Sequence, residues 1–238
     1  MISAPTYTCL PNVSVDGPAG AGKTTVARMF AREVRFRHID SGAMYRAVTL
    51  RALEDGWNGR DEDDEMLVSL ARNLDVQFGS DDAGEGLVLL GGIDRTEDLR
   101  CRAVEESVSF VARSPEVRLA LMYRQRELAR DGGVVMDGRD IGSFVLTGAE
   151  LKVYLTAALP VRIARRLLQR RCSGIRITWE EAARSVVNRD RIDSTRSVAP
   201  LRPAADAVII DSTHLTRSDV VRQMKFMLSD RMKDRGGG

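Results

Sequence analysis

The sequence predicts an α/β fold in which helices cover a mostly parallel, five-stranded sheet. Three observations favour this fold. Short apolar runs alternate with helical patterns along most of the chain, as parallel strands joined by helices require. A glycine-rich turn lies directly between the first apolar run and the first helical pattern. Acidic and hydroxyl residues follow several of the runs, at the sheet edge where such folds bind ligands.

The five strands of the sheet are expected, in chain order, at residues 13–15, 36–39, 133–136, 151–155 and 207–210. Each is a short apolar run bounded by turn residues or a helical pattern. The helices are expected at residues 23–34, 41–53, 61–73, 103–110, 114–130, 160–171, 178–191 and 217–232. Ser41 is expected to cap the second helix, and Thr178 with Glu181 forms a capping box at the seventh.

The pattern changes between residues 74 and 102. Residues 75–78 and 87–90 are typical of strands, with a Gly- and Asp-rich stretch between them, and Gly91 with Gly92 turns the chain again. Hairpins do not belong to a parallel series, because parallel strands need longer crossovers. We therefore expect a small antiparallel insert at residues 74–102, within a core formed by residues 12–73 and 103–238.

The glycine-rich turn matches the phosphate-binding P-loop, G-x-x-x-x-G-K-[ST]. Its residues are Gly17, Pro18, Ala19, Gly20, Ala21, Gly22, Lys23, Thr24 and Thr25. Glycines let successive backbone N–H groups curl around anionic oxygens, and the helix that follows directs its positive end at them. We expect a three-layer fold of the P-loop NTPase type, with ATP phosphates bound by this loop and by the charge of Lys23.

Two oxygen-bearing side chains are candidates for binding Mg²⁺. In P-loops the hydroxyl at the position of Thr24 binds Mg²⁺. Asp137 ends an apolar strand, as the metal-associated acid of these enzymes does. The alternative for Asp137 is a turn residue, since Asp-Gly is a common turn signal and Gly138 follows it.

Transfer of a phosphoryl group needs positive charge around it, and four arginines in or near the expected site are candidates to supply that charge. They are Arg46, Arg139, Arg189 and Arg196. If the helix continues from Asn188 to Arg196, Arg189, Asp193 and Arg196 share one face. The alternative for that face is a solvated row of ion pairs.

A second group of arginines predicts a mobile lid at about residues 162–178. Arg165 and Arg170 are its candidates for contacting the phosphates, on a helix that carries further arginines at spacings of three and four. The alternative is an ordinary soluble helix face.

Composition limits the partners and the compartment. Lys and Arg number 36 against 34 Asp and Glu, so no global basic field indicates nucleic acid or a membrane surface. The three cysteines are far apart, which favours reduced thiols in a cytoplasm. No apolar run is long enough to span a bilayer, and the first residues do not resemble a secretory signal. We expect a cytoplasmic monomer with small-molecule substrates.

Five motifs taken in order resemble the bacterial cytidylate kinases over nearly the whole chain. They are residues 17–25, Asp40-Ser-Gly-Ala-Met-Tyr-Arg46, Asp137-Gly-Arg-Asp-Ile-Gly142, Asn188-Arg-Asp-Arg-Ile-Asp193 through Arg196, and Ala199-Pro-Leu-Arg-Pro-Ala-Ala-Asp206. The resemblance implies that ATP, with Mg²⁺, phosphorylates CMP or dCMP to give ADP with CDP or dCDP. It also implies a five-stranded parallel core, an arginine-bearing lid and an antiparallel insert beside the monophosphate site.

The resemblance also implies roles for individual residues. Ser41, Arg46, Arg139 and Arg196 are expected to bind the CMP phosphate, with Tyr45 nearby, and Arg189 and Asp193 the ribose. Ser109, Arg118 and Asp140 are expected to read cytosine, and Lys23, Arg139, Arg189 and Arg196 to act in catalysis. The chemistry agrees for the base, because a carboxylate accepts from the N4 amino group of cytosine and an arginine donates to its acceptor edge.

Two alternative functions remain open from the sequence. One is a P-loop kinase of another small acceptor, such as UMP, AMP or a shikimate-like acid, which would share the loop, the lid and the arginines. The other is a nucleotide-binding switch or a nucleic-acid-dependent ATPase, which would predict a basic groove or a long partner-binding segment.

Overall fold

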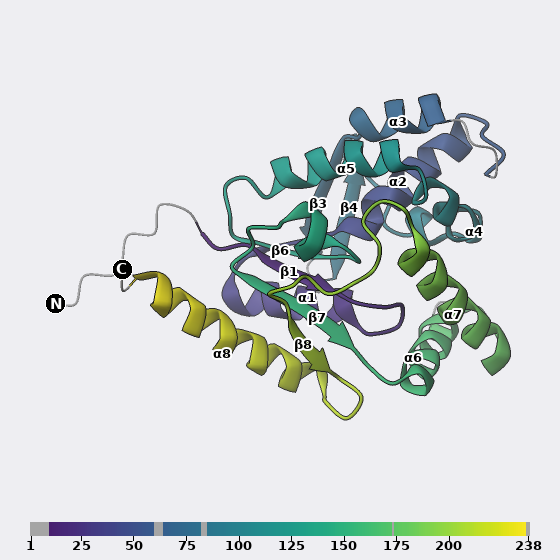
Figure 1. Cartoon of the computed structure of the whole chain (residues 1–238). Helices are drawn as coiled ribbons and strands as arrows, with labels where there is room; N and C mark the ends of the chain where they lie inside the picture. The colour runs from purple at the N-terminus through teal and green to yellow at the C-terminus, as the bar shows by residue number, and fades with distance from the viewer. Residues whose placement is uncertain (1–9, 60–63, 82–84, 173, 237–238) are drawn as a thin grey trace.

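The computed structural model describes residues 10–59, 64–81, 85–172 and 174–236, and a five-stranded parallel sheet lies at its centre (Figure 1). Its strand order is β2-β6-β1-β7-β8. The strands are β1 (Val13–Asp16), β2 (Arg37–Asp40), β6 (Val134–Asp137), β7 (Leu151–Thr156) and β8 (Val208–Asp211). Every neighbouring pair is parallel, which confirms the predicted sheet.

Helices cover both faces of this sheet, which makes three layers. α1 (Lys23–Val34) and α8 (Arg217–Gly236) share one apolar core with β1, β7 and β8, while α5 (Pro115–Leu128) packs on the other face. β6 shows why both faces are needed: Val135 belongs to the first core, and its neighbours Val134 and Met136 belong to the second. Side chains alternate along a strand, so an apolar run is buried fully only between two layers.

A second sheet is antiparallel and has three strands, β3 (Val76–Ser80), β4 (Gly86–Leu90) and β5 (Ile93–Asp94). The predicted hairpin is confirmed, but β5 was not predicted, because two residues are too few to show alternation. Gly91 and Gly92 make the turn into it with φ of 57° and 78°. Apolar residues of β3 and β4 share a core with α2 (Ser41–Glu54), α3 (Asp64–Arg72), α4 (Arg102–Val111) and α5.

One predicted helix cap is wrong by a residue. Asp40, not Ser41, caps α2: its backbone is extended, and its carboxylate accepts from the N–H of Ala43 at 3.1 Å. Ser41 is already helical, and its hydroxyl instead donates to the carbonyl of Asp137 at 2.7 Å. The serine therefore ties α2 to the end of β6. Residues 61–63 of the predicted third helix lie outside the described residues.

α6 (Leu159–Cys172) and α7 (Trp179–Thr195) pack on each other beyond the end of β7, at the lower right of Figure 1. The predicted capping box of Thr178 and Glu181 is present, with bonds of 2.7 and 3.2 Å. α7 continues past the predicted end at residue 191, so Arg189 and Asp193 do lie on one helix. A 3₁₀ turn, η1 (Asp98–Arg100), and a π-helical turn, η2 (Ile141–Val145), were not predicted.

None of the helices in the described ranges is both long and apolar enough to cross a membrane. Cys101 and Cys172 are exposed free thiols, whereas Cys9 lies outside the described residues.

Candidate functional site

The P-loop joins β1 to α1 at the carboxyl edge of the sheet. At two of its positions only glycine fits. Gly17 and Gly20 have φ of 146° and 75°, and a Cβ on them would lie 2.0 Å from the carbonyl oxygen of Leu155 and 2.6 Å from that of Arg162. Gly22 begins α1 without a side-chain cap. The first N–H groups of α1 therefore remain available to an anion.

Lys23 is buried beneath the loop, with its side chain folded back. Lys23 is only 5% exposed, and Nζ donates to the carbonyl of Pro18 at 2.8 Å. Burial, together with repulsion from Arg139, lowers the pKa of this amine to about 7, against attraction by nearby carboxylates. An anion bound in the loop would restore the ordinary charge of this lysine.

Thr24 and Asp137, the two candidate Mg²⁺ ligands, lie together. The Thr24 hydroxyl donates to Asp137 Oδ2 at 2.6 Å, and Asp137 Oδ1 lies 2.7 Å from His38 Nε2. A hydroxyl and a carboxylate are hard oxygen donors, which fit Mg²⁺. Within the described ranges no three His, Cys, Asp or Glu residues cluster as a metal cage. One or two protein ligands are what Mg²⁺ uses when phosphates complete its shell.

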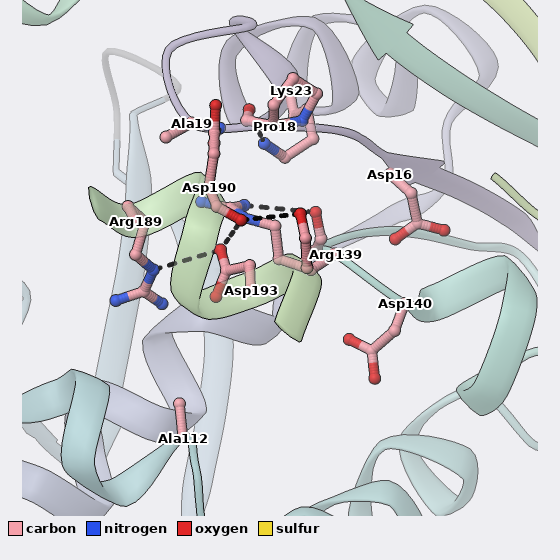
Figure 2. A network of polar contacts seen from close by, with 12 residues as sticks. Asp16, Pro18, Ala19, Lys23, Ala112, Arg139, Asp140, Arg189, Asp190 and Asp193 are labelled. Carbon is pink, nitrogen blue, oxygen red and sulfur yellow. Dashed lines mark hydrogen bonds and ion pairs between the residues drawn. The ribbon is translucent and has the colours of Figure 1, made fainter. Parts of the chain in front are cut away.

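Asp193 gathers three arginines, as Figure 2 shows in part. Arg189 lies on its own helix α7, Arg196 is the extended C-cap residue of that helix, and Arg139 follows β6. Its Oδ2 accepts from Nε of Arg139 at 2.9 Å and from Nε of Arg189 at 3.3 Å, and Arg196 Nη2 lies 3.5 Å from Oδ1. The carboxylate is 1% exposed, so this is not the solvated row of ion pairs. Burial would raise the pKa of Asp193, but the three arginines hold it below the ordinary value.

Arg118 and Asp140 form a buried ion pair between α5 and the segment after β6. Arg118 is 1% exposed, with its guanidinium 5.6 Å above the ring of Tyr45. Its Nη1 donates to the carbonyl of Ala112 at 3.3 Å, and Nε has no partner among the described residues. A buried polar pair with donor capacity left over suits recognition of a polar ring.

The other residues predicted for the monophosphate lie around this pair. Arg46 Nη2 donates to Asp40 Oδ2 at 2.6 Å, and its buried Nε finds no partner in the described part of the chain. Ser109 accepts from Arg189 Nη1 at 3.1 Å, so it contacts the arginine cluster around Asp193. Burial raises the pKa of Tyr45 to about 12, so it remains a neutral phenol.

The two predicted lid arginines, Arg165 and Arg170, contact different parts of the protein. Arg165 donates from Nη1 to the P-loop carbonyl of Ala21 at 3.0 Å and from Nη2 to the carbonyl of Ser212 at 2.9 Å. Arg170, two turns away from the loop on α6, forms an ion pair with Glu105 of α4. Of these two arginines, Arg165 is the one that contacts the P-loop.

Sequence reasoning missed Asp190 and Arg162. Asp190 Oδ1 accepts from the P-loop N–H of Ala19 at 2.8 Å, and Oδ2 pairs with Arg162. Arg162 in turn donates to the carbonyl of Ala19 at 3.0 Å. The only sequence signal was that Asp190 follows Arg189 within a charged motif, which does not reveal a contact with the distant P-loop.

Asp16, at the end of β1, was also missed. Its two carboxylate oxygens accept from the N–H groups of Ile141 and Gly142, each at 2.7 Å. Burial raises the pKa of Asp16 to about 7, although these N–H groups and Lys23 act in the opposite direction. The carboxylate thus anchors the turn after Asp140 to the central strand.

Comparison with known proteins gives consistent matches. The family model described as cytidylate kinase matches residues 13–229. A cytidylate kinase of Pelotomaculum thermopropionicum is 45% identical over 92% of this chain and 96% of its own, and one of Geobacillus thermodenitrificans is 44% identical over 92% and 97%. A solved uncharacterized protein from Eubacterium ventriosum, 8% identical, has a TM-score of 0.50 over 92% of this chain and 98% of its own. That last likeness concerns the fold alone.

Proposed function

Because this chain belongs to the cytidylate kinase family, we propose that it transfers the γ-phosphoryl group of ATP to CMP and dCMP, releasing ADP with CDP or dCDP. The observation that carries the choice of acceptor is the buried Arg118–Asp140 pair, whose two charges act on Arg196 of the arginine cluster. This arrangement combines a group able to read a base with a group able to hold a phosphate.

The transfer needs positioning and positive charge more than covalent chemistry. In this proposal the P-loop N–H groups and Lys23 bind the ATP phosphates. Ser41, Arg46, Arg139 and Arg196 hold the CMP phosphate in line with them, and Arg189 with Asp193 binds the ribose. Thr24 and Asp137 hold Mg²⁺, which supplies further positive charge at the phosphate oxygens. Release of Arg139 and Arg196 from Asp193 toward a phosphate exchanges one anionic partner for another, while Arg189 remains paired with the buried Asp193.

Recognition of cytosine follows from donors and acceptors. Asp140 accepts from the N4 amino group, and Arg118 donates to the O2 and N3 edge. Uracil has a carbonyl where cytosine has the amino group, so its O4 would face the carboxylate. A site that leaves buried polar groups unpaired rejects the wrong ligand by roughly 10⁴-fold or more.

The test is Mg²⁺- and ATP-dependent release of ADP with CMP, dCMP, UMP, AMP, GMP and shikimate offered separately at matched concentration. We expect turnover with CMP and dCMP far above the other four. Preference for UMP, AMP or shikimate would support a kinase of another acceptor. Idle reactions with all six would remove the kinase proposal and favour a nucleotide-binding switch.

We place this reaction in pyrimidine nucleotide metabolism of the cytoplasm, carried out by a monomer without nucleic acid. The near balance of charge, 36 basic against 34 acidic residues, supports the absence of a nucleic-acid partner. Sedimentation of the enzyme with and without its substrates tests the monomer.

A further inference from the structure

Glu105 on α4 contacts the lid helix α6 at two arginines. Its Oε2 lies 3.4 Å from Nη2 of Arg166, and it also pairs with Arg170 one turn further along α6. The three side chains are 21%, 22% and 19% exposed, so the group is largely shielded from water. Shielded pairs with two partners constrain a structure far more than exposed single pairs do.

The same face of α4 also contacts α7. Ser109 lies one turn after Glu105 and accepts from Arg189 Nη1 of α7 at 3.1 Å. Figure 1 shows α4 directly above α6 and α7. One face of α4, next to the proposed CMP site, thus contacts both the lid helix α6 and the helix α7 that packs on it.

α6 connects this face to the P-loop. Near its beginning, Arg162 and Arg165 donate to the loop carbonyls of Ala19 and Ala21, each at 3.0 Å. Near its end, Arg166 and Arg170 meet Glu105. The helix is therefore held at the ATP-binding loop by one pair of arginines and at α4 by the other.

We propose that Glu105 is a positioning residue of the reaction: it holds Arg166 and Arg170 so that α6 stays in place over the P-loop. Without this carboxylate, Arg166 would face Arg170 and Arg189, whose charges repel it. The lid would then open more often, and binding of ATP would have to close it. The inference rests on the proposed function for its kinetic consequence but not for the placement of the lid.

The experiment compares Glu105→Ala and Glu105→Gln with Glu106→Ala. Glu106 is a matched control, since it is the next residue on α4 and is exposed, and it pairs with Arg102 of its own helix at 2.6 Å. Lid opening is measured without nucleotide by the rate of tryptic cleavage after the exposed Arg171 and Arg176. We expect cleavage about tenfold faster in both Glu105 variants and unchanged in the control, as the loss of a coupled pair implies.

Kinetics supply the second measurement. We expect KM for ATP to rise roughly five- to tenfold in the Glu105 variants while kcat changes less than about threefold. Glu105→Asp, which keeps the charge, should recover part of the loss. Arg170→Ala should raise KM for ATP by less in the Glu105→Ala background than in the parent enzyme, because both changes break the same ion pair.

Several results would overturn the inference. A fall in KM for ATP would mean that Glu105 competes with the nucleotide for these arginines. Equal tryptic cleavage in Glu105→Ala and Glu106→Ala would mark an ordinary surface pair, and a lower Tm without faster lid cleavage would mark a structural role. A parent enzyme idle toward CMP would instead remove the proposed function, and the cleavage comparison would still decide the role of Glu105.

Discussion

At the scale of single residues, Lys23 carries its charge where little water reaches it. Its side chain is 5% exposed and its pKa falls to about 7, chiefly through burial. An unfolded chain binds the proton up to about pH 10.5. Stability contributed by this depressed pKa is therefore present above pH 10.5 and is lost as the pH falls to about 7.

Replacing Lys23 with methionine should separate stability from function. We expect Lys23→Met to lower kcat by about 10²–10³-fold, because it removes positive charge from the phosphate site. The nucleotide-free variant should melt about 3 °C or more above the parent at pH 7, and the difference should shrink toward pH 10. Differential scanning fluorimetry at both pH values measures this effect.

Lys225→Met is the control, since Lys225 is 47% exposed and far from the site. It should show neither the loss of turnover nor the pH-dependent gain. If Lys23→Met instead had a Tm well below that of the parent at pH 7, its loss of activity would follow from the loss of stability, and Lys23 would be structural.

Asp140→Ala should reduce selectivity at the base. We expect kcat/KM for CMP to fall by at least ~10²-fold and the gap to UMP to narrow, since the acceptor for the N4 amino group is gone. The variant also leaves buried Arg118 without its anion, which costs about 3–5 kcal/mol of stability. Steady-state kinetics with both nucleotides, together with the Tm, measure the two effects.

A double variant distinguishes selectivity from folding. Arg118→Met with Asp140→Leu replaces the pair by apolar groups of similar size, which should recover much of the lost Tm but none of the selectivity. If Asp140→Ala kept the parent's preference for CMP over UMP, the carboxylate would serve only to neutralise Arg118.

At the scale of elements, α7 connects the two halves of the site. Arg189 and Asp190 are neighbours on it, yet Arg189 binds Ser109 on the CMP side and Asp190 binds the P-loop at Ala19. Successive residues on a helix point about 100° apart, so one helix can contact two surfaces. We therefore expect the position of α7 to affect the binding of both proposed substrates.

Asp190→Ala tests this connection. Loss of the carboxylate leaves the Ala19 N–H and Arg162 without this partner, and a charged hydrogen bond is worth about 1.5–3 kcal/mol. We expect KM for ATP to rise about tenfold or more. Asp190→Asn, which keeps an acceptor for the N–H, should show a smaller rise. Initial rates at varied ATP and saturating CMP give these values.

Glu180→Gln serves as the control on the same helix, because Glu180 is exposed. It should leave KM for ATP at the parent value. An unchanged KM in Asp190→Ala would show that α7 does not position the P-loop.

At the scale of the whole molecule, the site is assembled from both sheet faces and from the lid, so ligands should stabilise the entire fold. CMP at about 100 times its Kd adds roughly 2.7 kcal/mol to the free energy of unfolding. In a protein of this size that raises Tm by about 5–10 °C. UMP at the same concentration should raise Tm by less than about 2 °C, since its affinity is far lower. Equal shifts for both nucleotides would contradict recognition of cytosine by Asp140.

The local pattern of apolar residues predicted most helices and strands, because buried side chains recur at regular intervals along each of them. The apolar runs of β6 and β7 are strands between two layers, and Thr178 with Glu181 begins α7 as predicted. The pattern did not predict β5, which is too short to show alternation. It also placed the cap of α2 at Ser41, whereas the extended backbone at Asp40 makes Asp40 the cap.

The sequence by itself determined the P-loop motif and the parallel core and supplied most residues of the proposed site, because these depend on fixed spacing and on alternation along a short stretch. Only the tertiary structure decided their partners: Asp190 with Ala19, Asp193 with Arg139, and Glu105 with Arg170. Each of these pairs joins residues more than fifty positions apart in the chain. A charge in a sequence does not show which distant opposite charge folding will bring to it, since that choice depends on how whole helices pack against the sheet and against one another.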